Sequence, residues 1–191
     1  PLVVGSLHAM NTALESIGTD IRGRKVHSPE DLDRESEGLN GLETDEFDIG
    51  SIEQGTISAV AGRASVNWVL KAGELALASA VDAIVTAPIH KEACRMAGYR
   101  DIGHMEIFQR ISGVTNVATM LMAGNLRVVH LTTHRSLRNA CDYVTRHNVL
   151  SKIRLTHEHF RRWGFEQPRI AIAALNPHAS DGGLIGDEEK N

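Results

Sequence analysis

The sequence predicts an α/β fold with a mostly parallel sheet and flanking helices. Short apolar runs that read as buried strands alternate with longer segments of helical periodicity, an order typical of parallel strands joined by helices. The clearest strand-like runs are 81–87 and 170–175, each closely followed by a proline, and the clearest helix is 57–80. These three segments carry the prediction of the fold class.

The first predicted element is a strand at 1–5, which leads directly into a helix at 6–17. On this helix the apolar residues recur at the three- and four-residue spacing of a single helix face. They are Leu7, Met10, Leu14 and Ile17.

Residues 19–50 differ from the segments around them, because they are rich in charge and glycine. We expect a partly ordered surface excursion here, with a candidate helix start at 28–31. The Ser-Ile-Glu-Gln sequence at 51–54 resembles a capping box, which favours a helix start just before 57–80.

Two short helices, two strands and one long helix are expected between residues 91 and 163. The strands at 118–122 and 126–132 are too close for a helical crossover and predict an antiparallel hairpin. Thr145 is a suitable N-cap for the long helix, which runs to Trp163. The short helices are 91–96 and 105–112.

Composition excludes several classes of protein. The chain has 191 residues, 42% hydrophobic and 23% charged, with a net charge of −4, and it lacks a basic stripe. We therefore expect a globular protein with neither a nucleic-acid nor a membrane partner. Cys94 and Cys141 are too few for a disulfide framework, so we expect packing residues and a reducing, cytoplasmic location.

The two ends of the chain lead us to expect part of a longer protein. The chain starts on a strand without an initiator methionine and stops at 187–191, next to its most informative motif. We expect an N-terminal start and a C-terminal region to be missing. The sequence leaves the boundary between two domains open.

Two histidines follow predicted strands directly. His134 comes after 126–132, and His178 comes after 170–175. Open α/β sheets bind ligands beyond the carboxyl ends of their strands, and imidazole is the commonest ligand of zinc and similar ions. The pair is therefore a candidate metal site that needs a third ligand. The alternative is local capping of the turns, where backbone groups lack partners.

Two further positions could contact an anionic substrate. Lys91 follows His90 at the end of the predicted strand 81–87, where a cation can meet a phosphate or a carboxylate. His104 opens a helix, and helix N-termini attract anions. The alternative at the first position is that Pro88 merely ends the strand.

Three well-known motifs are absent from the sequence. There is no G-x-G-x-x-G after a strand, no phosphate-loop lysine and no G-x-S-x-G elbow. Any nucleotide would therefore bind by a route other than the classical dinucleotide fingerprint.

Four collinear motifs resemble the 4-hydroxythreonine-4-phosphate dehydrogenase (PdxA) family of pyridoxal phosphate biosynthesis. Each motif alone is weak, but the four in this order are specific and span almost the whole chain. They are 82–93 (DAIVTAPIHKEA), 103–106 (GHME), 126–134 (LRVVHLTTH) followed by Leu137-Arg138, and 175–186 (LNPHASDGGLIG).

The resemblance implies a fold and an activity. The fold would be that of isocitrate and isopropylmalate dehydrogenases, not a classical Rossmann domain, in a homodimer with the active site between subunits. The activity would be oxidation of a hydroxy acid such as 4-phosphohydroxy-L-threonine by NAD, followed by decarboxylation. A divalent metal, zinc, magnesium or cobalt, would act as the Lewis acid in both steps.

The resemblance also implies roles for individual residues. His134 and His178 would bind the metal, and His104 would contact the small phosphorylated or carboxylated substrate, with Met105 and Lys91 beside it. The third metal histidine and most of the NAD contacts would lie beyond residue 191.

Met105 departs from the family pattern, which has a threonine after this histidine. Loss of a hydroxyl donor from an anion-binding corner should alter substrate recognition. The departure points to a paralogue for erythronate or threonate 4-phosphate or for a cis-dihydrodiol carboxylate. A non-catalytic metabolite-binding protein and a metal-dependent lyase or hydrolase are the other hypotheses.

Overall fold

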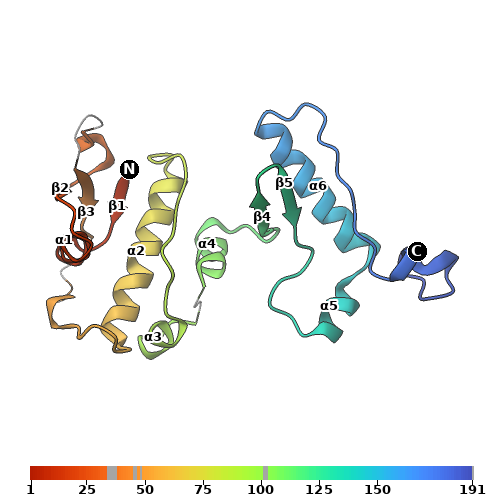
Figure 1. Ribbon diagram of the computed structural model, residues 1–191, viewed down its shortest axis with the longest axis horizontal. Helices are drawn as coiled ribbons and strands as arrows, with labels where there is room; N and C mark the ends of the chain where they lie inside the picture. The colour runs from red at the N-terminus through yellow and green to blue at the C-terminus, as the bar shows by residue number, and fades with distance from the viewer. Residues whose placement is uncertain (34–37, 45–46, 48, 101–102, 191) are drawn as a thin grey trace. The chain divides into compact units, whose positions relative to one another are not determined.

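A computed structural model describes residues 1–33, 38–44, 47, 49–100 and 103–190 of the chain (Figure 1). The chain divides into two compact units, Pro1–Val114 and Thr115–Asn191. Among the described residues, no helix combines the length and apolar character needed to cross a membrane.

A three-stranded parallel sheet forms the start of the first unit. Strands β1 (Leu2–Val4), β2 (Gly23–Val26) and β3 (Leu39–Leu42) lie in the order β1-β3-β2, with β3 paired to both neighbours. The mixed α/β class and the parallel sheet predicted from the sequence are confirmed.

The expected surface excursion at 19–50 is corrected by this sheet, because β2 and β3 both lie within that range. Asn40 and Leu42 are buried, although the surrounding sequence is polar. A side chain at Gly41 would lie 2.6 Å from Cδ2 of Leu7, so the glycine lets a helix pack closely on the strand. The candidate helix start at 28–31 is a short 3₁₀ turn, Pro29–Asp31.

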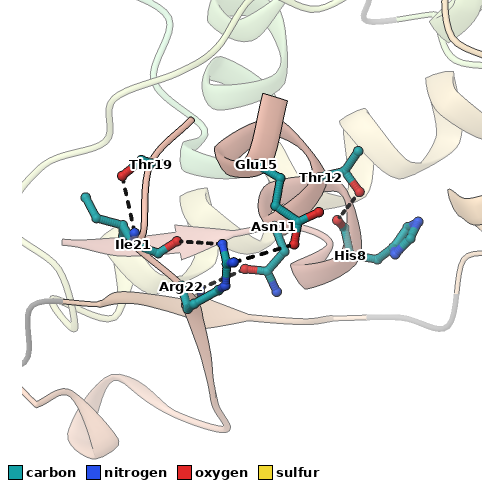
Figure 2. A network of polar contacts seen from close by, with 8 residues as sticks. His8, Asn11, Thr12, Glu15, Thr19, Ile21 and Arg22 are labelled. Atoms are coloured by element: carbon teal, nitrogen blue, oxygen red, sulfur yellow. Dashed lines mark hydrogen bonds and ion pairs between the residues drawn. The ribbon is translucent and has the colours of Figure 1, made fainter. Parts of the chain in front are cut away.

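Helix α1 (Leu7–Ser16) packs beside this sheet and is held there by polar contacts. The Ser6 hydroxyl caps it by accepting from the Ala9 amide at 3.2 Å. Asn11 Oδ1 accepts from the Gly23 amide at 2.8 Å, which joins the helix to the start of β2. Figure 2 shows the neighbouring part of this network, in which Arg22 lies 3.9 Å from Glu15.

Helix α2 (Ala59–Leu77) is the centre of the first unit. Its N-cap is Ser58, whose hydroxyl accepts from the Ala61 amide at 3.2 Å, so the expected capping box at 51–54 does not start the helix. One hydrophobic cluster joins Leu75 to Val26 and Leu42 of the sheet. A second cluster joins the middle of α2 to the helices that follow, through Val66, Val69, Cys94 and Ile107.

Helices α3 (Lys91–Met96) and α4 (His104–Ser112) both contact α2, as Figure 1 shows. Cys94 is fully buried in this packing, as expected for a structural cysteine, and burial raises the pKa of its thiol.

The second unit contains a hairpin and two helices. Strands β4 (Met120–Ala123) and β5 (Leu126–Val129) pair antiparallel, as the sequence predicted. Helix α6 (Arg146–Arg162) is capped by the Thr145 hydroxyl, which accepts from the Asn148 amide at 3.3 Å. Helix α5 (Leu137–Tyr143) was not predicted, and it leaves Cys141 exposed, against the packing role expected for it.

The two clearest apolar runs of the sequence, 81–87 and 170–175, are not strands among the described residues. Val85 is 97% exposed and Ile172 is 63% exposed. A strand requires a neighbouring strand to satisfy its backbone groups, and an apolar run alone does not supply one.

Candidate functional site

His178 lies in a turn with an unusual backbone. The turn spans Pro177–Gly182, and His178, Ala179, Ser180 and Asp181 are consecutive residues with positive φ, from 45° to 70°. Left-handed backbone at non-glycine residues is unfavourable and persists only where surrounding contacts enforce it. Such strain clusters at functional sites, so the turn supports a functional role for His178.

The imidazole of His178 is oriented by a carboxylate on the same turn. Nδ1 of His178 lies 3.1 Å from Oδ2 of Asp181, and the His178 side chain is 77% exposed. When Nδ1–H donates to Asp181, Nε2 keeps its lone pair and can serve as a ligand atom. A carboxylate on the far ring nitrogen is the usual arrangement of a metal-binding histidine.

Asp181 was not among the site residues predicted from the sequence. Its signal was its position three residues after His178 in the acidic, glycine-rich motif.

The middle of the turn is anchored at Ser180, which is 1% exposed. Its carbonyl accepts from the amides of Gly183, Leu184 and Ile185, at 2.9, 2.9 and 3.1 Å. Its hydroxyl donates to a carboxylate oxygen of Glu189. The turn is therefore closed by a residue nine positions further along the chain.

Glu189 also accepts from Asn176, where the turn begins. Oε1 of Glu189 accepts from the Asn176 amide at 2.6 Å, and Oε2 accepts from Asn176 Nδ2 at 2.9 Å. The bond from the Asn176 amide is the largest of the contacts that lower the pKa of Glu189 to about 2. The carboxylate is thus held in its charged form.

His134, the second predicted metal ligand, lies between β5 and α5 and is exposed. Its φ is +54°, so both predicted ligands have left-handed backbone. The next residue, Arg135, places its guanidinium carbon 4.3 Å from the centre of the Tyr143 ring. The Ser136 hydroxyl caps α5 by accepting from the Asn139 amide at 3.3 Å. These contacts fix the turn that carries His134.

The donor set is compatible with a divalent metal but incomplete within the described residues. No group of three or more histidine, cysteine, aspartate or glutamate side chains suited to a metal occurs in the part of the chain that the structure describes. His134 and His178 supply two imidazoles, and Asp181 supports one of them. A closed site needs further ligands from elsewhere.

The predicted substrate residues belong to the first unit. Lys91 is the first residue of α3 and is exposed. His90, its neighbour, caps that helix, because its Nδ1 accepts from the Ala93 amide at 3.4 Å. His90 therefore has a structural role, while the ammonium of Lys91 can meet an anion.

His104 opens α4, after Gly103, and both His104 and Met105 are half-buried. Nε2 of His104 is buried without a hydrogen-bond partner among the described residues. Buried polar atoms are nearly always paired, so an unpaired one at a helix N-terminus suits a bound anionic ligand. The substrate contact of His104 stays a prediction.

Comparisons with known proteins agree with these motifs. The sequence model of the family described as pyridoxal phosphate biosynthetic protein PdxA matches residues 1–191. A 4-hydroxythreonine-4-phosphate dehydrogenase from Beijerinckia indica is 39% identical over 98% of this chain and 56% of its own length. A D-threonate 4-phosphate dehydrogenase from Cupriavidus necator is 34% identical over 100% of this chain and 57% of its own length.

The fold matches a solved structure as well. The crystal structure of 4-hydroxythreonine-4-phosphate dehydrogenase from Klebsiella pneumoniae superposes with a TM-score of 0.92 at 34% identity. The match covers 98% of this chain and 57% of that one. The chain therefore spans a little over half the length of the relatives it matches. By sequence and by structure, the chain belongs to the PdxA family.

Proposed function

We propose that the full-length protein oxidises a 4-phosphorylated hydroxy acid with NAD and a divalent metal, and that the product then loses carbon dioxide. The observation that carries this proposal is the His178–Asp181 pair in its strained turn, within a chain similar to two phosphate-ester dehydrogenases. We further propose the fold of isocitrate dehydrogenase, a homodimer and a cytoplasmic location for the whole protein.

The residues of this chain would have separate roles, because some would hold the metal and others would bind the substrate. When bound, NAD accepts a hydride and the metal stabilises negative charge on the substrate oxygen. His134 and Nε2 of His178 would hold the metal, while Asp181 keeps the His178 ring in the required tautomer. Nε2 of His104 would hydrogen-bond an anionic oxygen of the substrate, and Lys91 would add positive charge.

Met105 favours a substrate other than 4-phosphohydroxy-L-threonine. A thioether is a weak acceptor and offers no hydroxyl donor. A substrate site with Met105 therefore recognises one polar group fewer than a site with threonine at this position. D-Threonate 4-phosphate, the substrate in the name of the Cupriavidus relative, is the first alternative. Erythronate 4-phosphate and a cis-dihydrodiol carboxylate follow it.

A panel of these acids tests the function in the full-length protein. NADH absorbance is followed with each acid in the presence of zinc, magnesium or cobalt. NADH formation that depends on added metal is expected for one acid. Turnover without NADH would indicate a lyase or hydrolase, and binding without turnover would indicate a metabolite-binding protein.

Single substitutions assign the residues. His134→Ala and His178→Ala should each lower metal content and turnover together, and normal metal stoichiometry in both would refute the ligand assignment. His104→Ala should mainly raise KM, and an unchanged KM would remove His104 from the substrate site.

A further inference from the structure

The turn that presents His178 has a conformation that its own backbone does not favour. Four successive non-glycine residues are left-handed, and two glycines with positive φ, Gly182 and Gly183, follow them. A turn of this kind reverts to other conformations unless contacts from outside it hold its backbone.

Glu189 contacts both the beginning and the middle of the turn. Its carboxylate accepts from the Asn176 amide, from Asn176 Nδ2 and from the Ser180 hydroxyl. All three of these groups donate, so the position requires two acceptor oxygens. Ser180 is buried, and bonds to charged groups are stronger than bonds between neutral ones.

The neighbouring Glu188 differs in a useful way. Its Oε2 accepts from Asn176 Nδ2 at 2.6 Å and from the Asp187 amide at 3.1 Å. These bonds therefore reach Asn176, at the beginning of the turn, and not Ser180. Glu189 contacts both the start and the middle of the turn, whereas Glu188 contacts its start. Substitutions at these two positions therefore distinguish the two contacts.

We propose that Glu189 is a positioning residue whose carboxylate locks the Asn176–Ser180 backbone and thereby presents His178, paired with Asp181, to a divalent cation. Glu189 acts through the turn, because its carboxylate bonds to Asn176 and Ser180. The consequence for cation binding rests on the metal role proposed above for His178. The lock itself does not, because its effect on the turn is measured by backbone amide exchange without any metal.

The test compares Glu189→Gln with Glu188→Gln in the full-length protein. Glutamine keeps the shape of glutamate but replaces one acceptor oxygen with a donor, so at position 189 a donor would face a donor. Thermal unfolding first establishes that both variants fold. If Glu189→Gln does not fold, the measurements are made on Ser180→Ala instead. That substitution removes only the hydroxyl group that donates to Glu189.

The first measurement is amide hydrogen exchange at 183–185, whose amides donate to the Ser180 carbonyl. Glu189→Gln should speed exchange there by about fivefold or more, because a charge-assisted bond that holds the turn is lost. Glu188→Gln should change it less than twofold. Equal exchange in the two variants overturns the proposal.

The second measurement is a titration with Co²⁺ alone, followed by its visible absorbance. Glu189→Gln should weaken Co²⁺ binding by about 10–100-fold, the range found when a residue supporting a metal ligand is replaced. Excess Co²⁺ should then restore kcat, which general unfolding would not permit.

The outcomes separate the two proposals. If His178→Ala weakens Co²⁺ binding but Glu189→Gln does not, the positioning role is wrong and the metal role stands. If exchange quickens in Glu189→Gln but His178→Ala leaves Co²⁺ binding unchanged, the lock stands and the metal role is wrong.

Discussion

The two units of the chain are stabilised in different ways. All the buried apolar side chains of the described residues lie in Pro1–Val114, where most of them form two clusters around α2. In the described part of Thr115–Asn191 the one buried residue is Ser180, a polar residue. Burial of apolar area stabilises the first unit, whereas helix caps, a short hairpin and a polar turn maintain the second.

The candidate metal residues lie in the second unit. His134 and His178 belong to the unit with little apolar burial, and both sit on left-handed backbone. A segment with few buried contacts is easily reshaped, so its functional turns need explicit polar anchors. The contacts of Asp181 and Glu189 are such anchors.

The largest expected effect is a loss of stability on truncating the core of the first unit. Ile107 is fully buried, so Ile107→Ala should lower the free energy of unfolding by about 2–5 kcal/mol. Leu184→Ala is the control in the second unit, because Leu184 is 87% exposed, and a change within about 0.5 kcal/mol is expected. Urea unfolding of the full-length protein measures both. A loss above about 1 kcal/mol for Leu184→Ala would mean that the Leu184 side chain is buried in the full-length protein. The difference in apolar burial between the two units would then hold only for residues 1–191.

A steric substitution within α2 should give the next effect. A Cβ at Gly62 would lie 2.0 Å from the Ala93 carbonyl oxygen, so Gly62→Ala forces α2 and α3 apart. A loss of about 1–3 kcal/mol is expected by thermal unfolding. At Gly73 the Cβ would meet the flexible Cδ1 of Ile111 at 2.2 Å, so Gly73→Ala should cost less. Equal losses would mean that backbone contact between the helices is not the cause.

In the second unit, loss of the imidazole partner should affect metal binding more than stability. Asp181→Asn keeps the size of the side chain but weakens its hold on Nδ1 of His178. Metal affinity should fall about 10–100-fold, measured by Co²⁺ titration. Asp142→Asn on α5 is the matched control and should leave affinity unchanged. A normal affinity in Asp181→Asn would remove the carboxylate–histidine pair from the metal site.

The smallest expected effect is a pH dependence of stability in the first unit. Lys25, whose Nζ lies 3.1 Å from Glu43 Oε2, together with the Leu7 amide, lowers the pKa of Glu43. The native pKa lies below 4.5, so the stabilisation is complete above pH 4.5 and is lost as pH falls through the native value. The contribution should be about 1 kcal/mol or less, because the pair is partly exposed.

Glu43→Gln should therefore flatten the fall in unfolding free energy below pH 4.5, measured by urea unfolding at a series of pH values. Glu53→Gln is the control outside the sheet edge. If both substitutions flatten the curve equally, the Lys25 contact does not explain the pKa of Glu43.

Local patterns in the sequence determined much of the helical structure. The Ser6 and Thr145 caps and the hairpin at β4–β5 follow from side chains close in sequence to the backbone groups they affect. Short sequence motifs also identified His104, His134 and His178 as candidate site residues. Short-range interactions of this kind depend little on the rest of the chain.

The tertiary structure decided what depends on distant partners. Gly41 became a core position because α1 packs on β3, and no pattern within 19–50 encodes that contact. The apolar runs at 81–87 and 170–175 remained unpaired among the described residues because a strand forms only where a neighbour bonds to it. Likewise, the sequence placed His178 after an apolar run, but only folding brought Glu189 back to Ser180 and fixed the turn that presents His178.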